Sequence, residues 1–196
     1  MRILLASRSP RRADLLNSAG YTYDVMPGDV NETVHPGENP DDYVARMARA
    51  KGAVVAEGYP DRFVLSADTV VVIDGAILGK PLDAEHAQVM LEQLSGRIHE
   101  VLTGVTVSHG QSVITQVERT RVRFRKLTPN EIAAYVGSGE FQDKAGGYAI
   151  QGLASRFVDH IEGSYSNVVG LPIALVDYLL HKIHNEDASE SDAFWF

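Results

Sequence analysis

The sequence predicts an α/β domain with a mixed sheet. Apolar segments of strand length alternate along the chain with capped segments of helical periodicity, a pattern typical of strands joined by crossover helices. Two long alternating segments, 100–108 and 113–125, instead meet directly around His109–Gly110 and predict an antiparallel hairpin. A chain with both kinds of connection predicts a sheet with both parallel and antiparallel pairs.

The chain opens with a predicted strand, a short polar loop and a helix. Residues 2–6 are apolar and predict a buried strand, and 10–19 predict a helix that Gly20 ends. Ser9 is a good N-cap, and Pro10 suits the first helical position because proline has no N–H to lose there.

Two arginines, Arg11 and Arg12, stand in the first turn of this helix. Cations there face the positive end of the helix dipole, which costs stability. A bound polyanion explains the misfit, because guanidinium groups and free N–H groups could share its oxygens. Two solvated arginines are the alternative, and this segment alone favours them.

The middle of the chain continues the alternation of strands and helices. The expected elements are a strand at 22–26, a loop at 27–39, a helix from Pro40 to about Glu57, strands at 63–67 and 70–73, a return strand at 76–78 and a helix from Asp83 to about Leu94. Asn39 caps the first of these helices and Asp83 the second. Asp68–Thr69 is expected to break the strand that begins at Phe63.

After the hairpin the chain becomes less regular. Arg119, Arg121, Arg123 and Arg125 alternate with buried-type residues and predict a solvated strand face. The remaining expected elements are a helix from a Thr128–Glu131 capping box to Val136, an irregular segment at 137–152, a strand at 157–161, a polar loop at 163–170 and a helix from Pro172 to about Ile183. Residues 1–184 are expected to form a single domain, with 185–196 an acidic, frayed tail.

Composition excludes several classes of protein. The formal net charge of −8 argues against a large nucleic-acid-binding surface, while leaving room for a local basic pocket that takes a small anion. The absence of cysteine excludes disulfides, thiolate zinc sites and a cysteine nucleophile. Neither a signal peptide nor a membrane-spanning run is recognised, so a cytoplasmic location is expected.

Two carboxylates are candidates for chemistry. Asp68 directly follows an apolar strand, where acids of α/β sheets often reach a crevice, and it either caps a turn or binds a metal. Glu32 lies in an acidic loop and by itself reads as solvent-exposed. Paired in space, the two would offer Mg²⁺ the hard oxygen ligands that it prefers.

Three lysines are candidates for binding an anion. Lys51 lies within a helix and by default is solvated. Lys80 stands in Gly79-Lys80-Pro81 and Lys144 in another glycine-containing loop, and both loops can aim an ammonium group. No Walker loop is present. The spacing of the histidines suggests no metal site, and His99 is expected to have a structural rather than a catalytic role.

Several of these segments together resemble the Maf family, in family order across residues 3 to 183. They are Ala6-Ser7-Arg8-Ser9-Pro10-Arg11-Arg12, Ser66-Ala67-Asp68-Thr69-Val70-Val71, Gly79-Lys80-Pro81, Ser95-Gly96-Arg97-x-His99-x-Val101-x-Thr103-Gly104-Val105, Asp143-Lys144-Ala145-Gly146-Gly147-Tyr148-x-Ile150-Gln151-Gly152 and Ser164-Tyr165-x-Asn167-Val168-Val169-Gly170-Leu171-Pro172. The resemblance implies a mixed twisted sheet flanked by helices with a cleft, related to the inosine triphosphate pyrophosphatases. It also implies hydrolysis of a nucleoside triphosphate at its α–β phosphoanhydride, giving the monophosphate and pyrophosphate.

The resemblance assigns roles to residues. It implies that Glu32 and Asp68 hold a divalent metal (Mg²⁺, or Mn²⁺ or Co²⁺ in its place), with Asp68 also catalytic. The residues implied to bind the triphosphate are Ser9, Arg12, Lys51, Lys80 and Lys144.

The resemblance also indicates a substrate. A branch of the family that acts on dTTP and UTP carries the residues found here as Arg11, Thr69 and Gln151, whereas a branch that acts on 7-methyl-GTP has Trp, Gln and Glu in those places. A broader damaged-nucleotide pyrophosphatase and a non-enzymatic regulator of septum formation stay open as alternatives. The expected partner is the nucleotide, with neither nucleic acid nor membrane, and a homodimer is left open.

Overall fold

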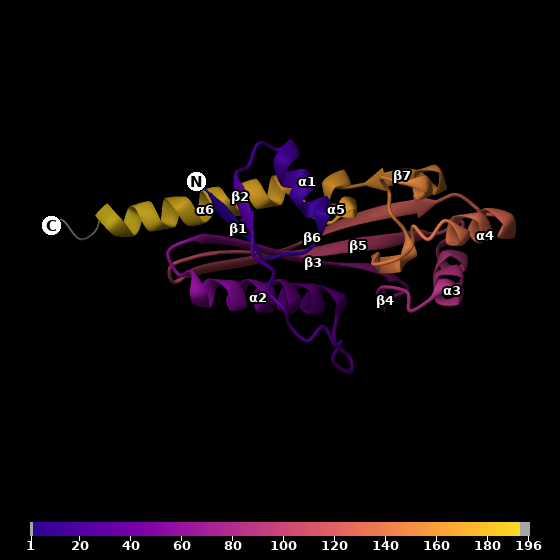
Figure 1. The fold of residues 1–196 in the computed structure, drawn as a ribbon, viewed down its shortest axis with the longest axis horizontal. Helices are drawn as coiled ribbons and strands as arrows, with labels where there is room; N and C mark the ends of the chain where they lie inside the picture. The colour runs from indigo at the N-terminus through magenta and orange to yellow at the C-terminus, as the bar shows by residue number, and fades with distance from the viewer. Residues whose placement is uncertain (1, 193–196) are drawn as a thin grey trace. The chain divides into compact units, whose positions relative to one another are not determined.

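The computed structural model describes residues 2–192. Its strands are β1 (Ile3–Leu5), β2 (Tyr23–Val25), β3 (Phe63–Ile73), β4 (Ala76–Leu78), β5 (Ile98–His109), β6 (Ser112–Phe124) and β7 (Val158–Glu162). Its α-helices are α1 (Pro10–Ser18), α2 (Pro40–Gly58), α3 (Ala84–Leu94), α4 (Pro129–Gly137), α5 (Tyr165–Val169) and α6 (Ile173–Asp192), and two 3₁₀ helices are η1 (Ala145–Gly147) and η2 (Leu153–Phe157). Figure 1 shows these elements in chain order.

The strands form one mixed sheet, as the sequence predicts. Their order is β2-β1-β3-β5-β6-β7, and β4 pairs with β3 beside this path. β1 lies parallel to β2 and to β3, whereas β4 runs antiparallel to β3 and β7 antiparallel to β6. β1 and β2 are joined through α1, whereas β3 and β4, and likewise β5 and β6, follow each other through short turns, so the two kinds of connection predicted from the sequence are both present.

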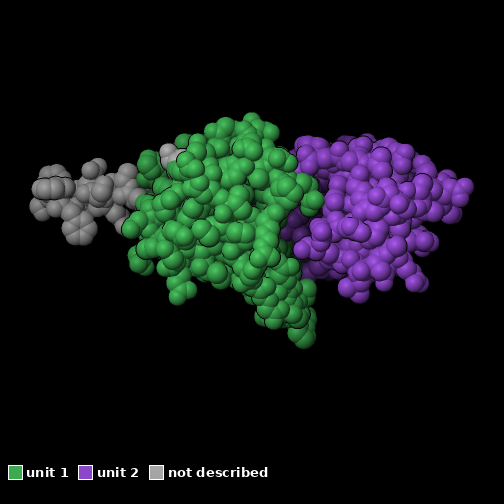
Figure 2. Space-filling view, viewed as in Figure 1, with its two compact units in different colours: residues 1–68, 103–118, 170–196 green, residues 69–102, 119–169 purple. Residues whose placement is uncertain are grey.

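By their internal contacts the described residues fall into two compact units, coloured separately in Figure 2. The first unit comprises the chain up to Asp68, residues 103–118 and the chain from Gly170. The second comprises residues 69–102 and 119–169. The single domain over 1–184 stays a prediction. Within the part of the chain that the structure describes, no helix has both the length and the apolar character to cross a membrane.

The first unit buries both faces of its central strands. Leu5 and Leu65 belong to a cluster that includes Leu16 of α1 and Leu179 of α6. The next residue on the other side of the pleat, Val64, instead packs with a smaller cluster that includes α2. Because neighbouring residues of a strand point to opposite faces, helices cover this part of the sheet on both sides.

Two small residues let α2 lie unusually close to the sheet. A Cβ added to Gly104 of β5 would stand 2.2 Å from the carbonyl oxygen of Val44, and one added to Gly52 of α2 would stand 2.6 Å from Ser66 Oγ. The Ser66 hydroxyl donates to the carbonyl of Ala48 at 2.7 Å. This close approach sets how near the side chains of α2 come to β3.

The second unit has an aromatic core. His99, Phe124 and Tyr148 meet edge to face, and Phe157 packs in the same way against both Phe124 and Tyr135. The Nε2 atom of His99 lies 2.8 Å from the Tyr148 hydroxyl. Burial lowers the pKa of His99 to about 4, so the ring is neutral at pH 7. The structural reading of this histidine is therefore the one that the geometry supports.

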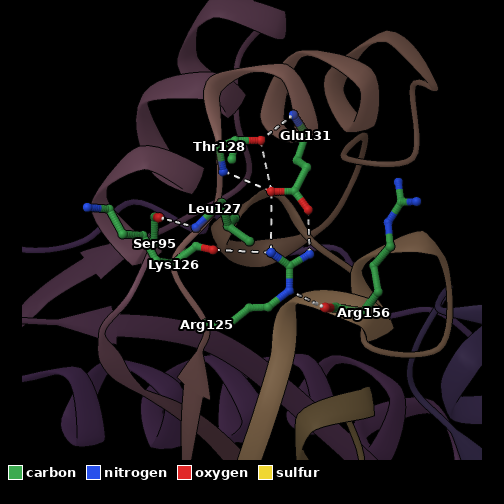
Figure 3. Close-up of polar contacts among 7 residues, drawn as sticks. All are labelled: Ser95, Arg125, Lys126, Leu127, Thr128, Glu131 and Arg156. Carbon is green, nitrogen blue, oxygen red and sulfur yellow. Dashed lines mark hydrogen bonds and ion pairs between the residues drawn. The ribbon is translucent and has the colours of Figure 1, made fainter.

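Arg125, at the end of β6, organises a corner of the second unit (Figure 3). Its Nη2 lies 2.6 Å from Glu131 Oε1, and its Nε donates to the carbonyl of Arg156 at 2.9 Å. Glu131 is also the partner of Thr128 in the predicted capping box, which is confirmed. One guanidinium thus ties β6 to the start of α4 and to η2. Arg119, Arg121 and Arg123 form ion pairs along the exposed face of the same strand, as a solvated face requires.

Three expectations about elements differ from the structure. Asp68–Thr69 does not break a strand, because β3 runs without interruption from Phe63 to Ile73. The expected polar loop at 163–170 contains the short helix α5, whose start is capped where Asn167 N–H donates to Ser164 Oγ at 3.2 Å.

The last helix also differs from expectation. α6 continues past Ile183 to Asp192, so the backbone of the predicted tail is helical to that residue. Residues 193–196 of the tail lie outside the described residues.

Candidate active site

The loop between β1 and α1 holds a buried arginine. Arg12 is 9% exposed, its Nε donates to the carbonyl of Gly170 at 2.8 Å, and its Nη1 donates to Ser7 Oγ at 3.0 Å. Ser9 occupies the N-cap position, as predicted, but its side chain makes no capping bond, and its N–H donates to Ser7 Oγ at 3.2 Å. Ser7, which sequence reasoning passed over, therefore joins the loop to the arginine.

The charge of Arg12 is influenced by its surroundings. Burial lowers the pKa of its guanidinium. The carboxylates of Asp68 and Glu32 act in the opposite direction, which places both acids within electrostatic range of the arginine. The solvated-arginine alternative fails for Arg12, while Arg11 is half-exposed beside it.

Lys51 brings the two candidate carboxylates together. Its Nζ lies 2.6 Å from Asp68 Oδ1 and 2.6 Å from Glu32 Oε1. The side chains of Lys51 and Asp68 are each 12% exposed, whereas that of Glu32 is 46% exposed. Residues from a loop, the middle of α2 and β3 thus meet at one ammonium group, which the sequence spacing alone could not show.

The loop that carries Glu32 is held against α2. The Tyr43 hydroxyl donates to the backbone carbonyl of Glu32 at 3.0 Å, and burial raises the pKa of that hydroxyl to about 12. Farther along α2, Arg46 pairs with Glu38 at 2.5 Å and donates to the carbonyl of Thr33 at 3.1 Å. These bonds hold the loop at Glu32 and at positions that follow it, so the carboxylate of Glu32 extends from a supported backbone.

The grouping of Arg12, Lys51, Glu32 and Asp68 has the chemistry of a site for an anion and a hard cation. Two carboxylates that converge on one positive charge can equally face a divalent ion, since carboxylate oxygens suit Mg²⁺. No cluster of three or more His, Cys, Asp or Glu side chains suited to a metal occurs among the described residues. Mg²⁺ in enzymes that act on phosphates commonly takes one or two carboxylates from the protein and its other ligands from water and phosphate.

In the second unit, two loops that carry predicted phosphate ligands touch. Gly146 N–H donates to the carbonyl of Gly79 at 3.0 Å, which joins the Lys80 loop to the Lys144 segment. Lys80 is exposed, and Lys144 donates to the carbonyl of Gln142 at 3.1 Å. The backbone at Gly146 has φ +66 and lies against Val71, so a side chain there would disturb this junction.

The segment that bears Gln151 is anchored from both sides. Before it, Tyr148 contacts His99, and Ala149 N–H donates to the Tyr135 hydroxyl at 3.3 Å. After it, Leu153 N–H donates to Glu140 Oε2 at 3.0 Å. Gln151 itself is exposed at the turn between these anchors, a position from which a side chain can read a ligand.

The predicted site residues thus fall into two sets. Glu32, Lys51 and Asp68 meet in the first unit, Arg12 lies within electrostatic range of both acids, and Ser9 and Arg11 are close to Arg12 in sequence. Thr69 follows Asp68 in β3 and is half-buried, and it belongs with Lys80, Lys144 and Gln151 to the second unit. Their individual roles stay predictions. Ser7 and the Gly170 carbonyl could have been suspected only because they lie in motif segments, since no local pattern marks either one.

A family model and curated relatives match most of this chain. The family described as Maf-like protein matches residues 2–183. A protein named dTTP/UTP pyrophosphatase from Geotalea uraniireducens is 53% identical over 176 residues, which is 89% of this chain and 91% of that one. Another of the same name from Anaeromyxobacter dehalogenans is 51% identical over 92% of this chain and 93% of its own. Among solved structures, the Staphylococcus aureus Ham1 protein matches 63% of this chain and 72% of its own with a TM-score of 0.47 and 14% identity.

Proposed function

This chain belongs to the Maf family, and from that premise we propose that it hydrolyses dTTP and UTP to the nucleoside monophosphate and pyrophosphate. The relatives of about half identity that cover nine tenths of both chains are named for that activity. The structural observation that carries the proposal is the meeting of Arg12 and Lys51 with Glu32 and Asp68. Cations and acids in one place suit a triphosphate that arrives with a divalent ion.

We propose Glu32 and Asp68 as the holders of that ion, Mg²⁺ or in its place Mn²⁺ or Co²⁺. The fit rests on the convergence of their oxygens on one positive group in the structure. When bound, such an ion would act as a Lewis acid that neutralises phosphate charge. The protein's part is to hold the two carboxylates at a fixed separation, through the braced loop and the rigid strand.

The remaining chemistry falls to side chains and water. Asp68 positions a water molecule and takes its proton as the water attacks the α-phosphorus. The bond from the α-phosphorus to the bridging oxygen breaks, and pyrophosphate leaves with the electron pair. Arg12, fixed by Ser7 and Gly170, needs no reorganisation to meet phosphate oxygens, which is the condition for strong electrostatic catalysis.

Lys51, Ser9, Lys80 and Lys144 are proposed as further ligands of the triphosphate. Lys51 contacts both candidate carboxylates, and Ser9 offers its hydroxyl because that group makes no capping bond in α1. The joined loops of Lys80 and Lys144 supply two ammonium groups for the departing pyrophosphate. Charge on these groups stabilises the negative charge that the reaction redistributes.

The base is read by Arg11, Thr69 and Gln151 in this proposal. Amide and guanidinium groups can pair with the carbonyls and the N3–H of uracil or thymine. A wrong base leaves such groups unpaired, which is costly where water is excluded. The anchoring of the backbone on both sides of Gln151 supports this role, because discrimination requires a reader held in place.

A nucleotide substrate also agrees with the charge of the chain. A net charge of −8 repels a nucleic-acid backbone but is compatible with a local group of cations that binds one small anion. We propose a cytoplasmic location, where nucleoside triphosphates are used, and leave the assembly open between a monomer and a homodimer.

Substrate comparison tests the proposal. Purified protein is mixed with Mg²⁺ and equal concentrations of dTTP, UTP, CTP, ITP and 7-methyl-GTP, and the products are identified by phosphorus NMR. The proposal predicts pyrophosphate and monophosphate from dTTP and UTP, with kcat/KM at least about a hundredfold above that for the other nucleotides. Similar turnover of ITP or 7-methyl-GTP would instead indicate a broader scavenger. Absence of turnover with all five would favour a binding protein such as a regulator of septum formation.

A further inference from the structure

The position of Lys51 between Glu32 and Asp68 has a consequence for the order in which ligands bind. We propose that Lys51 occupies the metal position in the nucleotide-free protein, so that a divalent ion binds tightly only together with the nucleotide. This inference rests on the proposed function, because it concerns the same site.

The space between the two carboxylates is too small for an ammonium group and a metal ion together. The ammonium of Lys51 lies 2.6 Å from one oxygen of each carboxylate. A metal ion bound by the same two oxygens needs ligand distances shorter than a hydrogen bond, about 2.1 Å for Mg²⁺. The ammonium and a metal therefore cannot occupy the space between the carboxylates at the same time.

The positive charges of Arg12 and Lys51 also oppose the binding of a divalent ion without nucleotide. Arg12 and Lys51 balance Glu32 and Asp68 in a group of which only Glu32 is substantially exposed. A divalent ion that arrives alone adds two positive charges beside two cations, and repulsion is strong where water is scarce. An ion that arrives on a triphosphate brings an excess of negative charge, which offers the displaced ammonium a new partner.

The two cations differ in how freely they can respond. Arg12 is held through two bonds of its guanidinium, to the hydroxyl of Ser7 and the carbonyl of Gly170. Lys51 reaches the carboxylates at the end of a flexible four-carbon chain. Lys51 is thus the group that can turn from the acids to the phosphates, while Arg12 stays in place.

Metal and nucleotide should then bind cooperatively. Each ligand favours the arrangement in which Lys51 has left the carboxylates, and such coupling is reciprocal for two ligands at equilibrium. Until both arrive, Lys51 holds the carboxylates of Glu32 and Asp68 close to each other and offsets part of their negative charge. The lysine is therefore a positioning residue before substrate binds and a phosphate ligand afterwards.

A binding experiment without turnover tests this inference. The full-length protein, free of nucleotide, is titrated with Mn²⁺, and free ion is measured by electron paramagnetic resonance. Lys51→Met and Lys51→Gln remove the charge, and the second keeps a hydrogen-bond donor for the case in which the first does not fold. Both should bind Mn²⁺ about tenfold or more tightly than the unaltered protein. Circular dichroism checks that each variant is folded.

Two further variants test whether the effect depends on a positive charge at position 51 or on the loss of any positive charge from α2. Arg49→Met removes a positive charge from an exposed place on the same helix, and it should leave Mn²⁺ affinity unchanged. Lys51→Arg keeps the charge at the site, so its affinity should stay as weak as that of the unaltered protein. Equal affinity in Lys51→Met, Lys51→Gln and Arg49→Met would overturn the inference.

The coupling between metal and nucleotide can also be tested in the unaltered protein. Its Mn²⁺ titration is repeated with an α,β-imido analogue of dTTP, which cannot be hydrolysed between those phosphorus atoms, after correction for ion bound to the free analogue. The inference predicts at least about tenfold tighter binding with the analogue, and equal affinities contradict it. A failure here with normal pyrophosphate release would reject the role of Lys51 alone, whereas absence of release would reject the proposed function.

Discussion

Lys51 Nζ lies 2.6 Å from Asp68 Oδ1, and the side chain of each is 12% exposed. The contact joins the middle of α2 to the strand residue on which the proposed chemistry depends. A buried pair of this kind contributes little net stability, because removing two ions from water offsets most of their attraction. The contact instead fixes the positions of the two side chains, which would be mobile if they were solvated.

The close approach of α2 to the sheet should be essential to that position. Gly104→Ala would place a Cβ 2.2 Å from the Val44 carbonyl oxygen, so α2 must shift or the strand must bend. We expect the free energy of unfolding to fall by about 3 kcal/mol, measured by urea denaturation. Gly58→Ala, at the end of the same helix with no atom within 4 Å of its new Cβ, should cost nothing and thereby exclude a general intolerance of alanine.

The hydroxyl of Ser7 should matter to both stability and catalysis. It accepts hydrogen bonds from Ser9 N–H and from Arg12, and the latter is buried. Ser7→Ala should lower the free energy of unfolding by about 1 kcal/mol and lower kcat/KM for dTTP by about tenfold, because Arg12 loses its hydrogen bond to the Ser7 hydroxyl. Ser18→Ala, which removes an exposed hydroxyl from the end of α1, the helix that carries Arg12, should change neither quantity. Unchanged kcat/KM in Ser7→Ala would show that Arg12 is held without it.

His99 should make stability depend on pH. Burial lowers its pKa from 6.5 to about 4, so between these values the unfolded chain binds a proton that the folded chain does not. Its stabilising contribution is fully present above pH 6.5 and is lost as the pH falls toward 4, in total about 3 kcal/mol.

Replacement of His99 tests that dependence directly. His99→Gln should reduce the loss of unfolding free energy between pH 6.5 and 4, measured by urea denaturation at several pH values, relative to the unaltered protein. His160→Gln, on an exposed position of β7, should retain the original slope. Equal slopes in all three proteins would mean that His99 is protonated in the folded state within this range.

Local signals in the sequence were sufficient for most elements. Proline and a capping side chain mark the starts of α2 and α4, and both caps form as read. The helix α5 was missed because its cap, Ser164, lies among residues that also suit a loop. The break predicted at Asp68–Thr69 was wrong. The carboxylate of Asp68 pairs with Lys51, which the local sequence does not reveal, so Asp68 can stay within a continuous strand.

The site was predictable as a set of residues but not as an arrangement. Motif resemblance pointed to Arg12, Glu32, Lys51 and Asp68, and the structure brings these four together. The resemblance could not show that Lys51 lies between the two acids, because a residue's position in a helix or loop carries no information on its distant partners. Ser7 was missed for the same reason, since its importance comes from a bond to Arg12 rather than from its own local pattern.

The central claim is that Asp68 drives hydrolysis from this group of charges, and one comparison tests it most directly. Asp68→Asn keeps the shape of the side chain but removes its charge, whereas Asp61→Asn makes the same change at an exposed turn before β3. With saturating dTTP and Mg²⁺, and with folding verified by circular dichroism, kcat for pyrophosphate release should fall by about 10² to 10⁴ in Asp68→Asn and stay unchanged in Asp61→Asn. Near-normal kcat in folded Asp68→Asn would contradict the account.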